Sequence, residues 1–202
     1  MGIKDLRVTT AERPDYELMM QQRAAVLRQN NIKLQQMFKV VERLEPLDGA
    51  KKFLQWLKAT VPRAFLVTDI FEEYAQAMCE KLGHPMVFCN FLEADKEGFL
   101  ARNVVRMRSP AGWGSTSSYQ KTKCVEEFQR LNFRIIAVGA SFNDIGMLKA
   151  AEAGMFFKPP EKLTQAHPEI PAVRGYDDLK KRITEIIGQE EMKRSSSFYA
   201  VK

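Results

Sequence analysis

The stretch FRIIAVGASFND, residues 133–144, joins an apolar run to a loop of small and polar residues. The apolar run, Phe133–Val138, has the composition of a short strand that is buried on both faces of a parallel sheet. The loop Gly139–Asn143 follows it, and a helix is expected over Asp144–Ala153. A strand that passes through a small-residue loop into a helix is the repeating unit of α/β proteins.

The same alternation extends through most of the chain on both sides of this stretch. Apolar runs of strand length are separated by segments whose apolar residues recur every three or four positions, as in amphipathic helices. We expect strands at 64–67, 86–91 and 155–157, and helices at 50–59, 72–82, 120–131 and 176–187. Strands and helices that alternate with short links predict an α/β fold with a doubly wound, Rossmann-like parallel sheet.

The N-terminal region has a different pattern, which predicts a helical hairpin. Apolar residues between Tyr16 and Leu44 fall at helical spacing, and Asn30 and Asn31 between the two helices favour a turn. The predicted organisation is therefore a helical cap segment over residues 1–46, an α/β core over 47–188, and a polar, Ser-rich tail over 189–202 that is expected to be disordered.

Composition excludes several classes of protein. The 202 residues are 45% hydrophobic and 28% charged, as in an ordinary globular protein rather than a disordered or collagen-like chain. The formal charge of +6 favours an acidic partner only weakly, because acidic and basic residues are interspersed, so nucleic-acid binding is a weak alternative. Three cysteines without metal-ligand spacing, and no apolar stretch of membrane-spanning length, predict a soluble, intracellular protein without a membrane span, in the cytoplasm or an organelle matrix.

The residues that follow the predicted strands are the candidates for a functional site, because ligands of open α/β sheets bind at the carboxyl ends of the strands. These residues are Thr68 and Asp69 after one strand, Lys121 in the helix before another, and the loop from Gly139 to Asp144 after the latter. A hydroxyl, an ammonium group and a small-residue loop together are suited to hold a phosphate group.

Each candidate also has an ordinary structural interpretation. Thr68 is equally well suited to cap a helix, and Lys121 taken alone is most simply a surface lysine. Ser141, Asn143 and Asp144 are all residues that cap helices. Only the order and spacing of the whole set favours a phosphate site.

The ordered set resembles the haloacid dehalogenase superfamily of phosphatases, and more closely its bifunctional phosphoserine phosphatase and homoserine phosphotransferase branch. The resemblance covers about residues 3–181, and the segments that carry it are Pro14-Asp15-Tyr16, Gln22-Arg23, Phe65–Asp69 with Phe71, Lys121, Gly139–Asp144 and Tyr176–Leu179. It implies a helical cap on the α/β core.

The resemblance also implies a role for each matching residue. In the family, the position of Thr68 binds the phosphoryl group, and that of Lys121 neutralises both this group and the nucleophile. The positions of Asn143 and Asp144 hold the network of the active site, and the cap arginine that corresponds to Arg23 receives the substrate carboxylate. Asp69 and Ser141 complete the candidate phosphate- and substrate-binding set.

Two departures from the family pattern affect the chemistry. Family members have a strand ending in Asp-x-(Asp or Glu)-Gly, whose first Asp is the covalent nucleophile and a magnesium ligand. In this sequence that strand is missing, and the one matching string, Asp95–Gly98, has the character of a charged turn. The family loop also reads Gly-Asp-Ser, whereas this chain has Ala140, whose methyl group cannot coordinate Mg²⁺.

These departures lead to two alternative functional hypotheses. The first is a catalytically incompetent, phosphatase-like pseudoenzyme that serves as an accessory subunit, with Lys121 and Asp144 vestigial, no metal and no cofactor. A strand supplied by another chain would fill the sheet, so a protein partner or oligomer is expected. The alternative is an active, Mg²⁺-dependent phosphoserine phosphatase or homoserine phosphotransferase that an upstream or partner segment completes. A third hypothesis, an RNA-associated subunit, depends on the net charge alone.

Overall fold

The computed structural model describes residues 16–91, 94–101, 106–107 and 117–198. The chain divides into two compact units, Met1–Cys124 and Val125–Lys202. Within the described residues, each unit contains a sheet of three strands, in the orders β1-β2-β3 and β4-β5-β6. Parallel strand pairs with helices between them confirm the predicted α/β fold.

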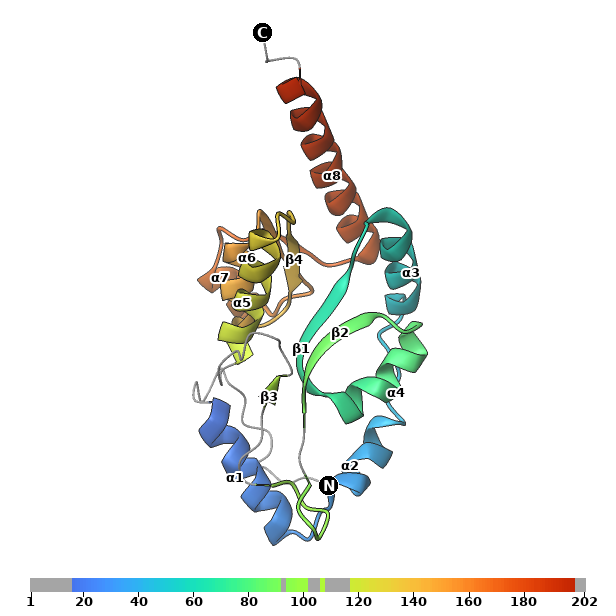
Figure 1. Ribbon diagram of the computed structural model, residues 1–202, viewed down its shortest axis with the longest axis vertical. Coiled ribbons are helices and arrows are strands. Elements are labelled where there is room, and N and C mark those ends of the chain that lie inside the picture. The colour runs from blue at the N-terminus through green and yellow to red at the C-terminus, as the bar shows by residue number, and fades with distance from the viewer. Residues whose placement is uncertain (1–15, 92–93, 102–105, 108–116, 199–202) are drawn as a thin grey trace. The chain divides into compact units, whose positions relative to one another are not determined.

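The first sheet is built around the pair β1, Phe65–Phe71, and β2, Met86–Phe91. These two strands are parallel, and β3, Arg106–Met107, pairs antiparallel with β2. Helix α4, Glu72–Leu82, connects β1 to β2 and packs on both (Figure 1). It ends at Gly83, whose φ of 85° is the left-handed conformation that glycine adopts at helix C-termini.

The predicted helical hairpin is present in the same unit. Helix α1, Tyr16–Gln29, is joined to α2, Leu34–Val41, through Asn31, which has a φ of 53° as expected for an asparagine in a turn. A third helix, α3, spans Ala50–Thr60.

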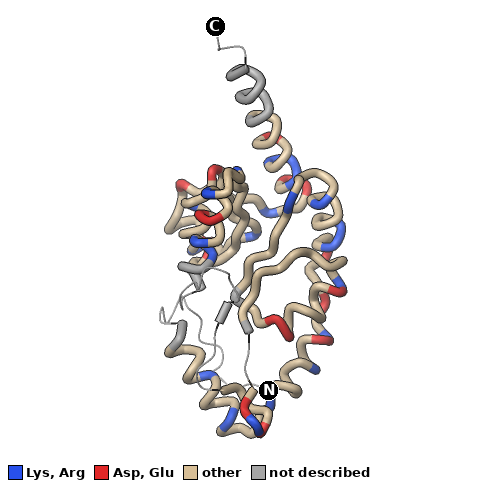
Figure 2. The backbone as a smooth tube through the Cα atoms, in the orientation of Figure 1, with Lys and Arg blue, Asp and Glu red and all other residues tan. Residues whose placement is uncertain are grey.

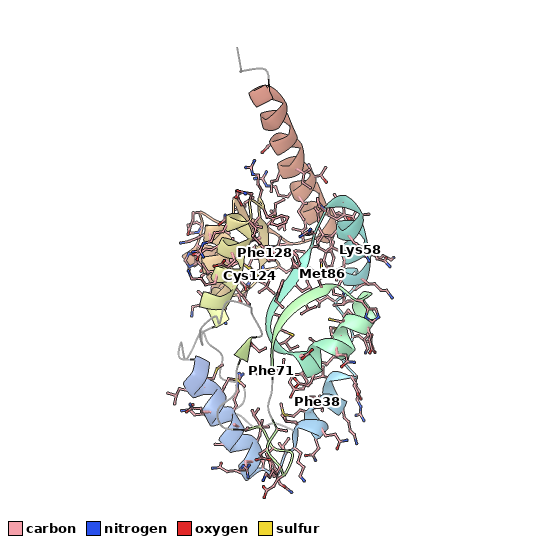
Figure 3. The ribbon with its side chains drawn as sticks, in the orientation of Figure 1. Phe38, Lys58, Phe71, Met86, Cys124 and Phe128 are labelled. Carbon is pink, nitrogen blue, oxygen red and sulfur yellow. The ribbon has the colours of Figure 1, made fainter. Side chains whose placement is uncertain are left out.

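A buried cluster joins this hairpin to α4 and the end of β1. Its residues are Met19, Met20, Ala24, Leu27, Ile32, Leu34, Phe71, Tyr74 and Leu100. Phe38 and Phe71, both labelled in Figure 3, make edge contacts with the Tyr74 ring, at centroid separations of 5.1 and 6.0 Å. Burial, and then the charge of Glu73, raise the pKa of Tyr74 to about 12.

The second sheet is wholly parallel and consists of β4, Ile136–Gly139, β5, Ala153–Phe157, and β6, Ala172–Val173. The other elements of this region are α5, Ser117–Arg130; η2, Phe142–Asp144; α6, Ile145–Ala150; α7, Glu161–Ala166; and α8, Tyr176–Phe198. A buried cluster of this unit consists of Val125, Ala137, Met147, Leu148, Phe156, Leu163 and Ile170.

Several element boundaries differ from the sequence prediction. The expected helix 144–153 begins as the 3₁₀ turn η2 and ends at Ala150, because its C-cap residue Ala151 is extended and β5 begins at Ala153. Helix α8 continues to Phe198, through residues expected to belong to a disordered tail, because this segment contains no proline and only one glycine, Gly188. The proposed domain boundaries at residues 46 and 188 remain predictions.

The surface chemistry of the described residues is mixed. Lys and Arg are interspersed with Asp and Glu over the described chain, although α2 and α3 carry lysines and no acidic residue (Figure 2). Among the helices described, none has the length and apolar character needed to cross a membrane. The expectation of nucleic-acid binding and the expected cellular compartment remain predictions.

Candidate active site

Thr68 lies inside β1, at the point where its pairing with β2 is interrupted. Val67 is opposite Phe88 and Phe71 is opposite Asn90, so the ladder shifts register between these pairs. Such irregularities turn side chains out of the regular alternation of a strand and occur beside active sites. The capping interpretation of Thr68 is wrong, because Phe71 is the N-cap of α4. The side chain of Asp69 is outside the described part of the structure.

The hydroxyl group of Thr68 has one defined hydrogen bond. Its Oγ1 accepts from the backbone N–H of Ile70 at 3.2 Å, which holds the irregular segment of β1 in place. A hydroxyl oxygen that accepts a hydrogen bond can still donate its own hydrogen. The Thr68 hydroxyl can therefore still donate its hydrogen to an anionic oxygen.

Lys121 lies in α5 and is buried, with 7% of its surface exposed. Lysine is almost never this buried without a partner, since the ammonium group is strongly hydrated in water. The interpretation of Lys121 as an ordinary surface lysine is therefore wrong. A buried cation at a fixed position is what recognition of a phosphate group requires.

The loop after β4 is organised by the carboxylate of Asp144. Its Oδ2 accepts hydrogen bonds from Ala140 N at 2.8 Å, Ser141 N at 2.9 Å and Ser141 Oγ at 2.8 Å. Asp144 is 7% exposed, and its own N–H donates to the carbonyl oxygen of Ser141 at 3.0 Å. Three donors to one carboxylate oxygen fix the loop conformation.

Gly139 is required by this arrangement, which sequence reasoning did not foresee. A Cβ atom at Gly139 would lie 2.4 Å from Cβ of Asp144. The sequence offered only the glycine itself as a signal, and a glycine in a loop is most simply a turn residue. Its role in admitting the Asp144 side chain depends on how the loop folds back on β4.

The Asp144 interactions also change how the loop is expected to bind an anion. The N–H groups of Ala140 and Ser141, expected to face a phosphate, are directed to the internal carboxylate of Asp144 instead. Asn143 is half-buried, and Ser141 is exposed. The carboxylate of Asp144 thus fixes the loop and already accepts hydrogen bonds from two of its backbone N–H groups.

Arg23 lies on α1 and is half-buried at the edge of the buried cluster of the first unit. Its Nη1 contacts Sδ of Met20 at 3.7 Å, and the adjacent Ala24 belongs to that cluster. The Nε atom of Arg23 is shielded from solvent within this packing. That Arg23 receives the substrate carboxylate remains a prediction.

Asp95 holds the turn that it begins through its own carboxylate. Its Oδ1 accepts from the N–H groups of Glu97 and Phe99, at 2.9 and 3.0 Å, and its carboxylate forms an ion pair with Arg28. The turn closes at Gly98, with a φ of 85°. The prediction that Asp95–Gly98 forms a turn is confirmed.

The candidate residues fall into two groups along the chain. Arg23, Thr68 and Lys121 belong to the first unit, and Ser141, Asn143 and Asp144 to the second. Among the described contacts, those of Ser141 with Asp144 join members of the set directly.

Comparison with known proteins identifies the family. The model of the haloacid dehalogenase-like hydrolases matches residues 3–152. The chain belongs to this family of hydrolases. It is 35% identical over 180 residues to phosphoserine phosphatase ThrH of Pseudomonas aeruginosa, a match covering 89% of this chain and 82% of the relative. It is 34% identical over 189 residues to a phosphoserine phosphatase of Pseudomonas syringae pv. tomato, covering 94% of this chain and 75% of the relative.

A solved structure supports the fold of this hydrolase. A substrate-bound phosphoserine phosphatase matches with a TM-score of 0.62 and 21% sequence identity, over 85% of this chain and 77% of that one. At this identity the likeness supports the fold alone. The resemblance to the phosphoserine phosphatase-like branch of the haloacid dehalogenase superfamily is confirmed by the family match and the curated relatives.

These findings correct the expectation of a catalytically incompetent accessory subunit. Relatives that match most of the chain are named as phosphatases, which are enzymes. The hypothesis gave too much weight to Ala140 and to the absence of one motif. It gave too little weight to the other site residues, namely Thr68 in its irregular strand, the buried Lys121 and the loop held by Asp144.

The described residues do not by themselves form a magnesium site. Phosphatases of this family are generally Mg²⁺-dependent, which agrees with the conditional expectation of Mg²⁺. Within the described part of the chain, however, no three His, Cys, Asp or Glu side chains gather as metal ligands would. Ala140 offers no donor, and Oδ2 of Asp144 already accepts three hydrogen bonds.

Proposed function

We propose that this hydrolase is a phosphoserine phosphatase, which converts phosphoserine and water to serine and inorganic phosphate. The observation that carries the proposal is the 35% identity, over 89% of the chain, to a relative named phosphoserine phosphatase ThrH. Homoserine phosphotransferase activity remains a prediction from the resemblance.

In this proposal, the phosphoryl group is bound by Thr68 and Lys121. The Thr68 hydroxyl, held by its bond to the Ile70 N–H, donates its hydrogen to a phosphoryl oxygen. The buried ammonium group of Lys121 offsets the charge that develops on the transferring group. Asn143 and Asp144 maintain the loop after β4, and Arg23 receives the substrate carboxylate.

The phosphoryl-accepting carboxylate is the remaining part of the proposed site. Asp95 is committed to its turn, so it does not provide this group. Among described residues, β1 pairs with β2 alone and β4 with β5 alone, so each has an edge able to pair with a further strand. We propose that a strand from outside residues 1–202, or from a partner chain, pairs with one of these edges and supplies the nucleophile.

The test is phosphate release from phosphoserine by the native protein isolated from its source cells, with Mg²⁺ present. We expect Lys121→Met to lower kcat/KM by a factor of about 100 or more, since one lost electrostatic contact to a transition state costs this much. The control is Lys58→Met, because Lys58 is exposed on α3 (Figure 3). A native protein that releases no phosphate from phosphoserine would contradict the proposal.

A further inference from the structure

The ammonium group of Lys81 binds the segment that joins the helical hairpin to the rest of the first unit. Lys81 lies in the last turn of α4, and the segment, residues 42–49, runs without regular secondary structure from α2 to α3. Its Nζ donates to the carbonyl oxygens of Glu42 and Leu44, at 2.9 and 2.6 Å, and to Oε1 of Glu45 at 2.7 Å. An ammonium group has three hydrogens to donate, so this one segment can use all of them.

These contacts are unusual for a lysine. The ammonium group of lysine is strongly hydrated and its stem is flexible, so most lysines remain in water. The side chain of Lys81 is 28% exposed, and two of its three acceptors are backbone carbonyl oxygens. Bonds to the backbone fix the path of the main chain, which an ion pair between two exposed side chains does not. Lys81 therefore holds the segment 42–49 against the C-terminal end of α4.

A second contact between the hairpin and α4 lies two turns earlier in this helix. There the Tyr74 ring packs edge-on against Phe38 of α2, and its hydroxyl group donates to Sδ of Met37 at 3.4 Å. Tyr74 and Lys81 are about 10 Å apart along the helix axis, at a rise of about 1.5 Å per residue. A single contact would let α2 pivot on α4, whereas two separated contacts define its orientation.

The orientation of the hairpin matters for the proposed site, because the hairpin and β1 carry different parts of it. Arg23 lies on α1, and α1 and α2 pack together through the buried cluster of this unit. Thr68 lies in β1, which leads directly into α4. The separation between the Arg23 guanidinium group and the Thr68 hydroxyl group thus depends on how the hairpin is held on α4.

We propose that Lys81 is a positioning residue, which sets the separation between Arg23 and Thr68 so that one substrate reaches both with its carboxylate and its phosphoryl group. This inference rests on the proposed function, in which Arg23 receives the carboxylate and Thr68 the phosphoryl group. A misplacement of about 1 Å in a site can cost about 100-fold in rate. A hairpin held at both ends of its contact with α4 avoids this loss.

The experiment compares phosphoserine with a ligand that does not need Arg23. O-phosphoethanolamine carries the phosphoryl and ammonium groups of phosphoserine but no carboxylate. Phosphate release by the native protein with Mg²⁺ gives KM for phosphoserine, and competition gives the inhibition constant of O-phosphoethanolamine. We expect Lys81→Met to raise KM about 10-fold, the value of one weakened charged hydrogen bond, and to leave the inhibition constant unchanged. The matched control is Lys39→Met, since Lys39 is exposed in the last turn of α2.

A double variant tests whether Lys81 acts through Arg23. Arg23→Met should raise KM for phosphoserine at least as much as Lys81→Met does, and Lys81→Met should add nothing in the Arg23→Met background. Effects that multiply would refute the positioning role, as would an equal loss of affinity for both ligands in Lys81→Met. Should Lys81→Met fail to fold, Glu45→Gln replaces it, since this exposed side chain supplies one of the three acceptors. A smaller change in the same direction is then expected.

Hydrogen exchange separates this inference from the proposed function. The amide hydrogens of Glu42, Arg43 and Leu44 bond to carbonyl oxygens of α2, and they should exchange faster in Lys81→Met than in Lys39→Met. Equal exchange in the two variants would refute the role of Lys81, while phosphoserine hydrolysis could still stand. Faster exchange in a protein that releases no phosphate from phosphoserine would support the contact of Lys81 with the segment and refute the proposed function.

Discussion

Asp144→Ala should destabilise the protein through the loop after β4. The substitution removes an oxygen that accepts from Ala140 N, Ser141 N and Ser141 Oγ, all within 2.9 Å. A hydrogen bond to a charged group contributes about 1.5–3 kcal/mol. The three losses do not add, because Ala140 and Ser141 are exposed and water can replace the lost acceptor. We expect a net loss of about 3 kcal/mol in the free energy of unfolding.

Urea denaturation followed by circular dichroism measures this loss. With an m-value of about 2 kcal/mol/M, the midpoint should fall by about 1 to 2 M urea. Ser141→Ala should cost about 1 kcal/mol, and it should add almost nothing in the Asp144→Ala background, because its hydroxyl then has no carboxylate to bond. The control is Asp177→Ala, since this side chain is fully exposed at the start of α8. The reasoning is refuted if Asp144→Ala shifts the midpoint no more than Asp177→Ala does.

Three further predictions test other parts of the structure. Asp95→Asn should leave phosphate release from phosphoserine unchanged and cost at most about 1 kcal/mol of stability by thermal denaturation, because it removes a partly exposed ion pair. Gly154→Ala should destabilise the fold, because its Cβ would lie 2.1 Å from the Leu148 carbonyl oxygen. Gly188→Ala adds a methyl group in open space inside α8 and should stabilise the fold by up to about 1 kcal/mol. Equal unfolding midpoints of the two variants would contradict this. Ala140→Asp should bind Mg²⁺ more tightly in calorimetric titration than Ala140→Asn, and equal affinities would show that position 140 does not contact the metal.

The sequence predicted the regular elements well where local signals were strong. The bounds of α4 and β2 match the prediction, since Gly83 marks the end of the helix and a compact apolar run marks the strand. The short elements α7 and β6 were not predicted, because six and two residues carry too little periodicity to recognise. Their positions depend on long-range pairing, such as that between β5 and β6.

The candidate site was predictable in its residues but less so in their environment. The spacing of Thr68, Lys121 and Asp144 indicated a phosphate site, but it could not distinguish a buried lysine from an exposed one. Burial of Lys121 is a property of the packed fold.

The loop after β4 shows why a missing metal ligand is weak evidence against an intact fold. The conformation of the loop depends on Gly139, which admits the Asp144 side chain, and on backbone N–H groups that donate to it. The side chain at position 140 takes no part in these hydrogen bonds, since Ala140 contributes only its backbone amide. An Asp-to-Ala difference there removes a possible ligand without removing any of these hydrogen bonds. Loss of a ligand and loss of the site are therefore separable, and each requires its own measurement.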